Sequence, residues 1–174
     1  IGGLNGKKMM LLEFPDGAIP HGSDVACRMF ADQGVHWLIA HPERNKAVMR
    51  NPDIIKPFVD MGCMLQLTAA SVVGAFGRSA GQTAHTLLTR GLAHVVASDA
   101  HNLAHRPPRM GEARRYLSQH FGMGIAYRLT EENPARILAE RVAEPGEELP
   151  LAQPQQATPA AAPQGVIPQR MYAN

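Results

Sequence analysis

Four side chains of types that commonly bind metals lie at the ends of apolar segments of the chain. They are Glu13, His41, Asp99 and His101. In a parallel α/β protein the carboxyl ends of the strands share one edge of the sheet, where ligands bind and reactions occur. Asp, Glu and His are ligands for Mn, Fe and Zn, and Mg is accepted at oxygen-rich positions. The placement therefore predicts part of a metal site.

Each of these residues also has a structural explanation when it is considered alone. Asp99 could cap a helix while His101 is solvated. His41 could be structural, and Glu13 could be an ordinary exposed carboxylate. If the segment is extended, Asp99 and His101 point to the same side and could bind one metal together or one metal each. Because three separate segments present such groups at the same end, the metal site and the structural explanation stand level on these residues alone.

Two arginines accompany the potential ligands in the same parts of the chain. Arg44 follows the first histidine, and Arg106 lies in the segment after the second. Guanidinium groups bind phosphate through paired hydrogen bonds, although either arginine alone could be a surface residue. Metals and arginines at one edge indicate hydrolysis of a phosphate ester. We expect Glu43 to orient Arg44 or to be solvated, and Asn102 to hold its loop.

The pattern of apolar residues alternates between strands and helices. Strands are expected at residues 8–13, 35–40, 63–67 and 92–97. Helices are expected from a Ser23 cap to Gly34, from Asn51 to Gly62, and over residues 80–90, 109–121, 125–129 and 133–142, with Asn133 as the start of the last. Strand starts recur about every 30 residues, the length of a βα unit. The chain is therefore predicted to be α/β, with a parallel sheet or part of a (β/α) barrel.

Composition excludes several other classes of protein. The chain has 174 residues, of which 45% are hydrophobic, and this is typical of one globular domain. Its net charge of +2 does not indicate binding to nucleic acid. No apolar run approaches the roughly 18 residues that span a membrane. Cys27 and Cys63 are expected to be buried free thiols, which fits a cytoplasmic protein. Residues 143–174 are rich in Pro, Ala and Gln and are predicted to be a disordered tail, either inert or partner-binding.

Five segments, taken in order, resemble the polymerase-and-histidinol-phosphatase (PHP) superfamily. They occupy residues 11–14, 39–44, 60–66, 94–102 and 106–110, and include Ala-His-Pro-Glu-Arg and Ser-Asp-Ala-His-Asn. Within the superfamily they are most similar to the bacterial protein-tyrosine phosphatases of capsular and extracellular polysaccharide operons. The similarity covers roughly residues 4–142, which makes residues 1–142 the expected phosphatase portion.

The resemblance implies a fold, a cofactor and a role for each candidate residue. The fold would be a distorted (β/α)₇ barrel with a three-metal cluster, most simply of Mn²⁺, with Fe, Mg or Zn as alternatives. Asp99 would bind the first metal, Glu13 and His41 the second, and His101 the third, while Arg44 and Arg106 would be the catalytic residues that grip the phosphate. The implied reaction is metal-dependent hydrolysis of phosphotyrosine in proteins. The implied partner is a polysaccharide-copolymerase tyrosine kinase.

The chain departs from the superfamily pattern at its start. The Asp-x-His-x-His strand that opens these proteins is absent, together with further ligands on early strands. We therefore expect the chain to be a C-terminal portion of the barrel that is inactive alone. Part of a barrel leaves unpaired strand edges and an exposed apolar inner face, which predicts either poor solubility or self-association, for example as a homo-oligomer.

Two other functions remain open from the sequence. The chain could be a different PHP phosphoesterase that acts on histidinol phosphate or a nucleotide, although the Arg-Pro-Pro segment at residues 106–108 favours the tyrosine phosphatase. It could also be a non-catalytic interaction module, a possibility that the missing ligands favour for this chain by itself.

Overall fold

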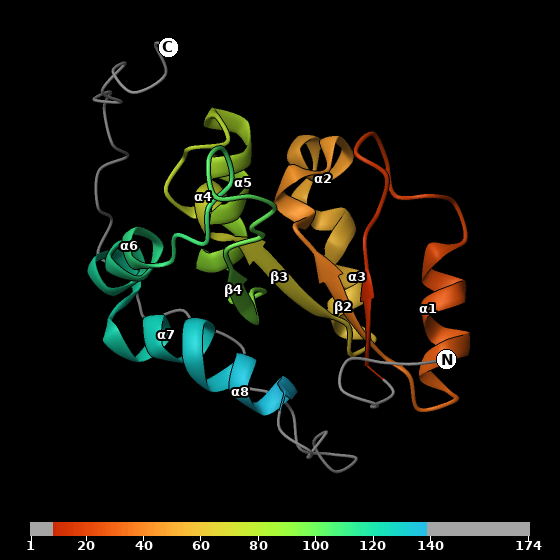
Figure 1. The fold of residues 1–174 in the computed structure, drawn as a ribbon. Helices are drawn as coiled ribbons and strands as arrows, with labels where there is room; N and C mark the ends of the chain where they lie inside the picture. The colour runs from red at the N-terminus through yellow and green to blue at the C-terminus, as the bar shows by residue number, and fades with distance from the viewer. Residues whose placement is uncertain (1–8, 139–174) are drawn as a thin grey trace.

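The computed structural model describes residues 9–138, which form an α/β fold around one parallel sheet. The strands are β1 (Met9–Leu12), β2 (His36–Ala40), β3 (Met64–Thr68) and β4 (Val95–Ala97), paired in sequence order. Figure 1 shows them side by side at the centre of the molecule. Because all three pairings are parallel, the carboxyl ends of the four strands lie along one edge. The predicted parallel sheet is confirmed.

Eight α-helices connect and cover these strands within residues 9–138. They are α1 (Ser23–Ala31), α2 (Lys46–Arg50), α3 (Lys56–Asp60), α4 (Ala69–Val72), α5 (Arg78–Thr89), α6 (Gly111–Phe121), α7 (Met123–Tyr127) and α8 (Asn133–Leu138). Two 3₁₀ turns, η2 (Pro42–Arg44) and η3 (Pro52–Ile55), and one π turn, η4 (Arg128–Glu132), join them. The sequence did not predict η2, α2 and α4, because segments of three to five residues are too short to show a helical period.

Of two helix starts predicted from capping residues, one is displaced and the other is confirmed. Ser23 is not a cap but the first residue of α1, and its hydroxyl donates back to the Pro20 carbonyl at 2.7 Å. Helix α8 does begin at Asn133, as predicted, although the preceding π turn runs into it with helical dihedral angles at that residue. The Asn133 side-chain amide is buried and donates to the His94 carbonyl at 2.7 Å. The Ser23 hydroxyl makes its hydrogen bond outside α1, so the capping signal is misleading at that start only.

The core lies on both faces of the sheet. Side chains alternate between faces along a strand, so Ile39, Leu65 and Val96 enter the main core under the helices. The opposite face carries a smaller buried cluster of Met9, Leu38, Met64, Val95 and Ile137. Ile137 belongs to α8, which therefore packs on this second face. The expectation of an exposed apolar inner face is largely wrong, because these strand residues are buried.

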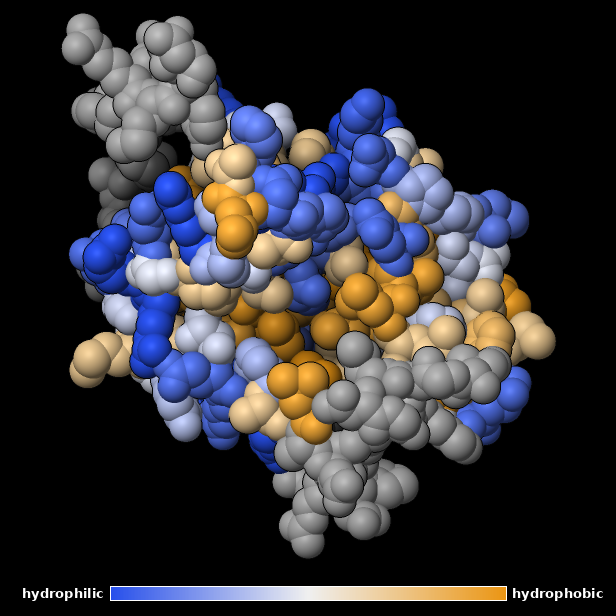
Figure 2. All heavy atoms as spheres, viewed as in Figure 1, coloured by the Kyte–Doolittle hydropathy of each residue, from blue (hydrophilic) through white to orange (hydrophobic). Residues whose placement is uncertain are grey.

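A smaller apolar area remains at the surface. Leu11 of β1 is 54% exposed and Leu138, at the end of α8, is 55% exposed. Figure 2 shows hydrophobic residues gathered in the middle of the viewed face, over the strands. Within the described residues β1 and β4 are the edges of the sheet. The predicted self-association would use these features.

Cys27 and Cys63 are free and buried, as expected, and burial raises the pKa of the Cys63 thiol to about 12. Within residues 9–138 we find no helix with the length and apolar character that crossing a bilayer requires. The tail predicted at residues 143–174, and the last four residues of the helix predicted at 133–142, lie outside the described part of the chain.

Candidate phosphate-binding and metal-binding site

The two arginines converge on one carboxylate at the strand ends. Arg44, from η2 after β2, donates from Nη1 to Oδ2 of Asp99 at 2.8 Å. Arg106, from the loop after β4, donates from Nη2 to the same oxygen, and to the Asp99 carbonyl at 3.1 Å. Both arginine side chains remain a little over one-quarter exposed. The site therefore holds two cations around one anionic oxygen, within reach of solvent.

The backbone is strained at two of the candidate residues. His41 has a φ of 33° and Asp99 a φ of 52°, and no other non-glycine residue within 9–138 has a positive φ. A non-glycine residue in this region costs on the order of 1 kcal/mol and tends to occur at functional sites. Here the unusual angles turn the chain sharply at the ends of β2 and β4, which brings both side chains to the edge of the sheet.

Glu13 and His41 form a second pair at this edge. The His41 Nε2 and Glu13 Oε1 atoms lie 3.2 Å apart; the His41 side chain is 12% exposed and that of Glu13 is 65% exposed. When one nitrogen and one oxygen bind the same tetrahedral or octahedral metal ion at usual bond lengths, the two atoms are about 3.0–3.4 Å apart. The pair therefore fits two adjacent positions of one metal ion.

His101 is oriented as a metal-binding histidine would be. Its Nδ1 lies 2.9 Å from the carbonyl oxygen of Asp99. A carbonyl can only accept, so Nδ1 carries the proton in this contact, and in that tautomer of the neutral imidazole Nε2 has the lone pair that a metal would need. Metal-binding histidines usually donate their other ring N–H to a carbonyl or carboxylate in this way. The side chain is 56% exposed, so an ion in solution can reach it.

Two asparagines hold the loops that carry these residues. The Oδ1 atom of Asn102 accepts hydrogen bonds from the amides of Ala104, His105 and Arg106, which confirms that Asn102 holds its loop. Asn45 caps α2 and donates from Nδ2 to the carbonyl of Pro15 at 2.7 Å. The second contact ties the loop after Glu13 to the end of β2. The sequence suggested the first of these roles and missed the second.

The expectation that Glu43 is solvated is wrong. Glu43 is fully buried, and its Oε1 accepts from the Thr68 amide at 3.0 Å. Burial raises the pKa of this carboxyl to about 7, against the opposing effect of the Thr68 amide and the nearby Arg44 charge. The Glu43 carboxyl accepts its hydrogen bond from Thr68 rather than from Arg44. Glu43 therefore joins the η2 turn to the end of β3 and fixes the base from which Arg44 extends.

A model of the family described as "Capsular polysaccharide synthesis, CpsB/CapC" matches residues 1–139. The chain belongs to the CpsB/CapC family. Its relatives include the tyrosine-protein phosphatase YwqE of Bacillus subtilis, 37% identical over 131 residues that cover 74% of this chain and 50% of YwqE. The tyrosine-protein phosphatase CpsB of Streptococcus pneumoniae is 34% identical over 114 residues, or 63% of this chain and 47% of CpsB.

The fold of this CpsB/CapC chain also matches a solved relative. The match has a TM-score of 0.73 and 34% identity and covers 77% of this chain and 54% of the other. It belongs to the crystal structures of YwqE from Bacillus subtilis and CpsB from Streptococcus pneumoniae, described as metal-dependent tyrosine phosphatases. The chain spans about half the length of the curated relatives it matches.

The CpsB/CapC chain presents its candidate ligands as separate pairs. Within residues 9–138 no group of three or more His, Cys, Asp or Glu side chains is arranged to hold one metal ion. Glu13 and His41 form one pair, while His101 is hydrogen-bonded to the carbonyl of Asp99. The donor atoms of these residues and the spacing of the Glu13–His41 pair suit a metal ion, but each group supplies only part of a ligand set.

The sequence missed one residue of the site altogether. The ring of Phe76 lies beneath both guanidinium groups, with its centroid 4.8 Å from Cζ of Arg44 and 5.7 Å from Cζ of Arg106. A signal was available, because Gly74-Ala75-Phe76-Gly77 follows the third strand at the same end of the sheet. Two glycines around an aromatic residue indicate a turn that presents the ring.

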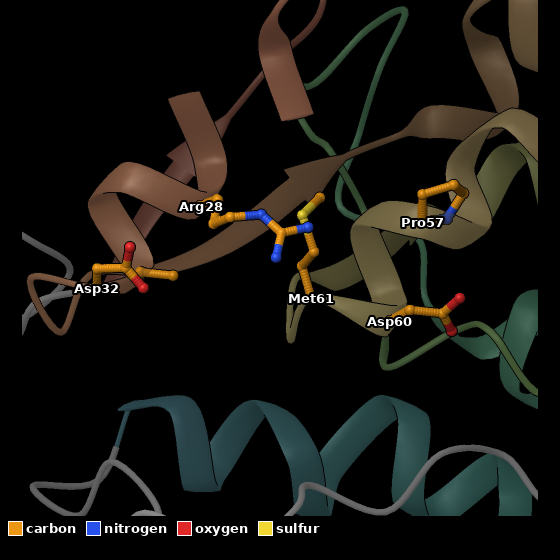
Figure 3. A pocket seen from close by; sticks show the side chains of 6 residues that line it. Arg28, Asp32, Pro57, Asp60 and Met61 are labelled. Atoms are coloured by element: carbon orange, nitrogen blue, oxygen red, sulfur yellow. The ribbon is translucent and has the colours of Figure 1, made fainter. Parts of the chain in front are cut away.

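A surface hollow of about 400 Å³ lies away from this cluster. It is lined by Arg28, Ala31, Asp32, Pro57, Asp60 and Met61. Figure 3 shows Arg28 extending from α1 toward Met61, which follows α3. These are the carboxyl ends of helices that lead into β2 and β3, so the hollow is at the opposite end of the sheet. The candidate site is a solvent-accessible edge rather than this hollow.

Proposed function

We propose that this chain supplies the phosphate-binding residues and part of the metal-binding residues of a metal-dependent phosphatase. Its substrate is phosphotyrosine in proteins of capsular and extracellular polysaccharide synthesis. One observation supports the proposal above the others, namely the convergence of Arg44 and Arg106 on a single oxygen of Asp99. A phosphate oxygen in that position would meet two guanidinium groups, whose charge-assisted hydrogen bonds suit phosphate recognition.

Each candidate residue has a defined task in this reaction. Arg44 and Arg106 bind the phosphoryl oxygens, orient the ester for in-line attack and stabilise the charge that develops on those oxygens. Asp99, Glu13, His41 and His101 would hold the metal ions, for which we propose Mn²⁺. Bound metal ions supply Lewis-acid stabilisation and lower the pKa of water. Asp99 also balances the arginine charges until phosphate binds.

The remaining parts of the site must come from outside the described residues. The ligands present form pairs only. We propose that the four strands are part of a (β/α)₇ barrel of the PHP type and that this chain alone does not turn over substrate. The protein partner would be a tyrosine kinase of the polysaccharide copolymerase. Histidinol phosphate and nucleotides have less support as substrates, because the relatives carry the name of tyrosine-protein phosphatase.

The test is a chimera in which this chain replaces the matching half of YwqE. We expect Mn²⁺-dependent release of phosphate from a phosphotyrosine peptide, lost on chelation and restored by Mn²⁺. Arg44→Ala should lower kcat/KM by about 100-fold, because it removes hydrogen bonds between a guanidinium and the charged phosphate, and such bonds contribute more than neutral ones. Arg115→Ala, an exposed arginine on α6, is the matched control. A folded, Mn²⁺-loaded chimera without turnover, or one that prefers histidinol phosphate, would contradict the proposal.

A further inference from the structure

Phe76 contacts both arginines of the proposed phosphate site. Its ring centroid is 4.8 Å from Cζ of Arg44 and 5.7 Å from Cζ of Arg106. Both distances are within the roughly 6 Å at which a cation is attracted to the negative face of an aromatic ring. The ring is 37% exposed, so it is a surface feature of the strand-end edge rather than a member of the core.

The order of the strands explains how one ring reaches two arginines. Arg44 follows β2, Arg106 follows β4, and Phe76 follows α4 at the end of β3. Because β3 lies between β2 and β4 in the sheet, the segment after it is placed between the other two loops. A side chain from the middle strand can therefore support side chains from both neighbours.

The turn that carries Phe76 is fixed by its neighbours. Gly74 and Gly77 adopt φ values of 79° and 91°, and the Gly77 amide donates to the Gly74 carbonyl at 3.1 Å. Helix α5 approaches the turn closely, since a Cβ on Gly81 would lie 3.3 Å from Cα of Gly74. These angles and this close packing are accessible to glycine and strained for other residues. The turn therefore presents the ring from a defined position.

We propose that Phe76 is the positioning residue of the phosphate site, and that it holds Arg44 and Arg106 so that both point at one anion. This inference rests on the proposed function for the identity of the anion. The two guanidinium groups repel each other, and Asp99 neutralises only one of their charges. The ring face attracts both cations, and it continues to do so when phosphate takes the place of the Asp99 oxygen.

The experiment measures binding of inorganic phosphate to the full chain by calorimetry, in chelator and at constant ionic strength. Phe76→Leu should weaken phosphate binding by about tenfold, because leucine fills similar space without a ring face. Phe76→Tyr should keep the affinity within about twofold, because tyrosine retains that face. Tyr127→Leu, which removes an exposed ring on α7, is the matched control and should bind phosphate normally. Melting temperatures without phosphate show whether each variant is folded.

A double-mutant cycle separates positioning from a general effect on the fold. In an Arg44→Ala/Arg106→Ala background, Phe76→Leu should have no further effect on phosphate affinity, because the ring then has no guanidinium to hold. Unchanged binding by a folded Phe76→Leu variant, or equal losses in both backgrounds, would overturn the role of Phe76 alone. A wild-type chain that fails to bind phosphate would overturn the anion site itself. Binding needs neither metal nor turnover, so these outcomes differ from a failure of the proposed hydrolysis.

Discussion

His94 and Asp99 flank the same strand, β4, and are bound in opposite ways. His94 precedes the strand, is buried, and accepts the Leu65 amide on Nδ1 at 3.1 Å. Burial lowers the pKa of His94 to about 4, so its ring is neutral at pH 7. Asp99 follows the strand at a positive φ, and its carboxylate is shared by two arginines that solvent can reach.

The difference shows how one strand serves both stability and function. At its first end the polar group is neutral and enclosed, and its partners are backbone groups that cannot leave without unfolding. At its second end the partners are charged side chains that can exchange one anion for another. We therefore expect substitutions at the first end to change stability, and substitutions at the second end to change phosphate binding.

The largest expected effect is on stability at the first end. His94→Ala should lower the free energy of unfolding by about 3 kcal/mol, because it leaves the buried Leu65 amide without an acceptor and opens a cavity. Asp99→Asn should change it by less than about 1 kcal/mol, since asparagine tolerates the left-handed backbone. Urea unfolding of the wild type, His94→Ala and Asp99→Asn at pH 7 measures both changes in the free energy of unfolding. Equal losses would erase the contrast between the two ends.

The next effect is the pH dependence of stability that His94 causes at the first end of β4. The folded-state pKa of His94, about 4, is below its ordinary value of 6.5. As pH falls from 6.5 to 4 the unfolded chain takes up a proton that the folded chain does not, so stability falls by about 3 kcal/mol. His94→Asn can still accept the Leu65 amide and should lack this loss.

Glu43 titrates in the opposite sense and serves as an internal reference for that measurement. Its raised pKa of about 7 means that the folded chain keeps a proton which the unfolded chain releases, so this contribution is lost as pH rises from 4.5 to 7. The Glu43 contribution is the same in the wild type and in His94→Asn, so the difference between their profiles of stability against pH isolates the contribution of His94. Parallel profiles would show that His94 is not held neutral.

The smallest effect is expected at the second end. Asp99→Asn removes the carboxylate that competes with phosphate for Arg44 and Arg106, so phosphate affinity in chelator should rise by about tenfold. Titration calorimetry measures the change, with Asp32→Asn, an exposed position just after α1, as the matched control. A lower affinity in Asp99→Asn would mean that the carboxylate assists the arginines in binding anions.

Much of this arrangement is predictable from the sequence for a simple reason. Strands buried on both faces are nearly continuous apolar runs, so β2 and β4 stand out, and polar residues just after them fall at the shared edge. His41 and Asp99 are found in this way. Their positive φ values are not, because no local pattern marks a histidine or an aspartate for that conformation.

The contacts that complete the site depend on tertiary structure. Glu43 and Arg44 are neighbours in sequence, yet the η2 turn sends one into the core and leaves the other at the surface. Phe76 belongs to a different loop from either arginine and meets them only because β3 pairs with both β2 and β4. Sequence spacing contains no information on such contacts until the order of the strands is known.

We expect Arg44 and Arg106 to form a site for one phosphate. The most direct test of this expectation is calorimetric titration of the full chain with inorganic phosphate in chelator, using Arg44→Ala/Arg106→Ala. We expect one binding site in the wild type and an affinity lower by at least about 100-fold in the double variant. Arg28→Ala/Arg115→Ala removes the same charge from exposed positions on α1 and α6 and should bind as the wild type does. Equal phosphate affinities in the wild type and the Arg44→Ala/Arg106→Ala variant would show that these two arginines do not form the phosphate site.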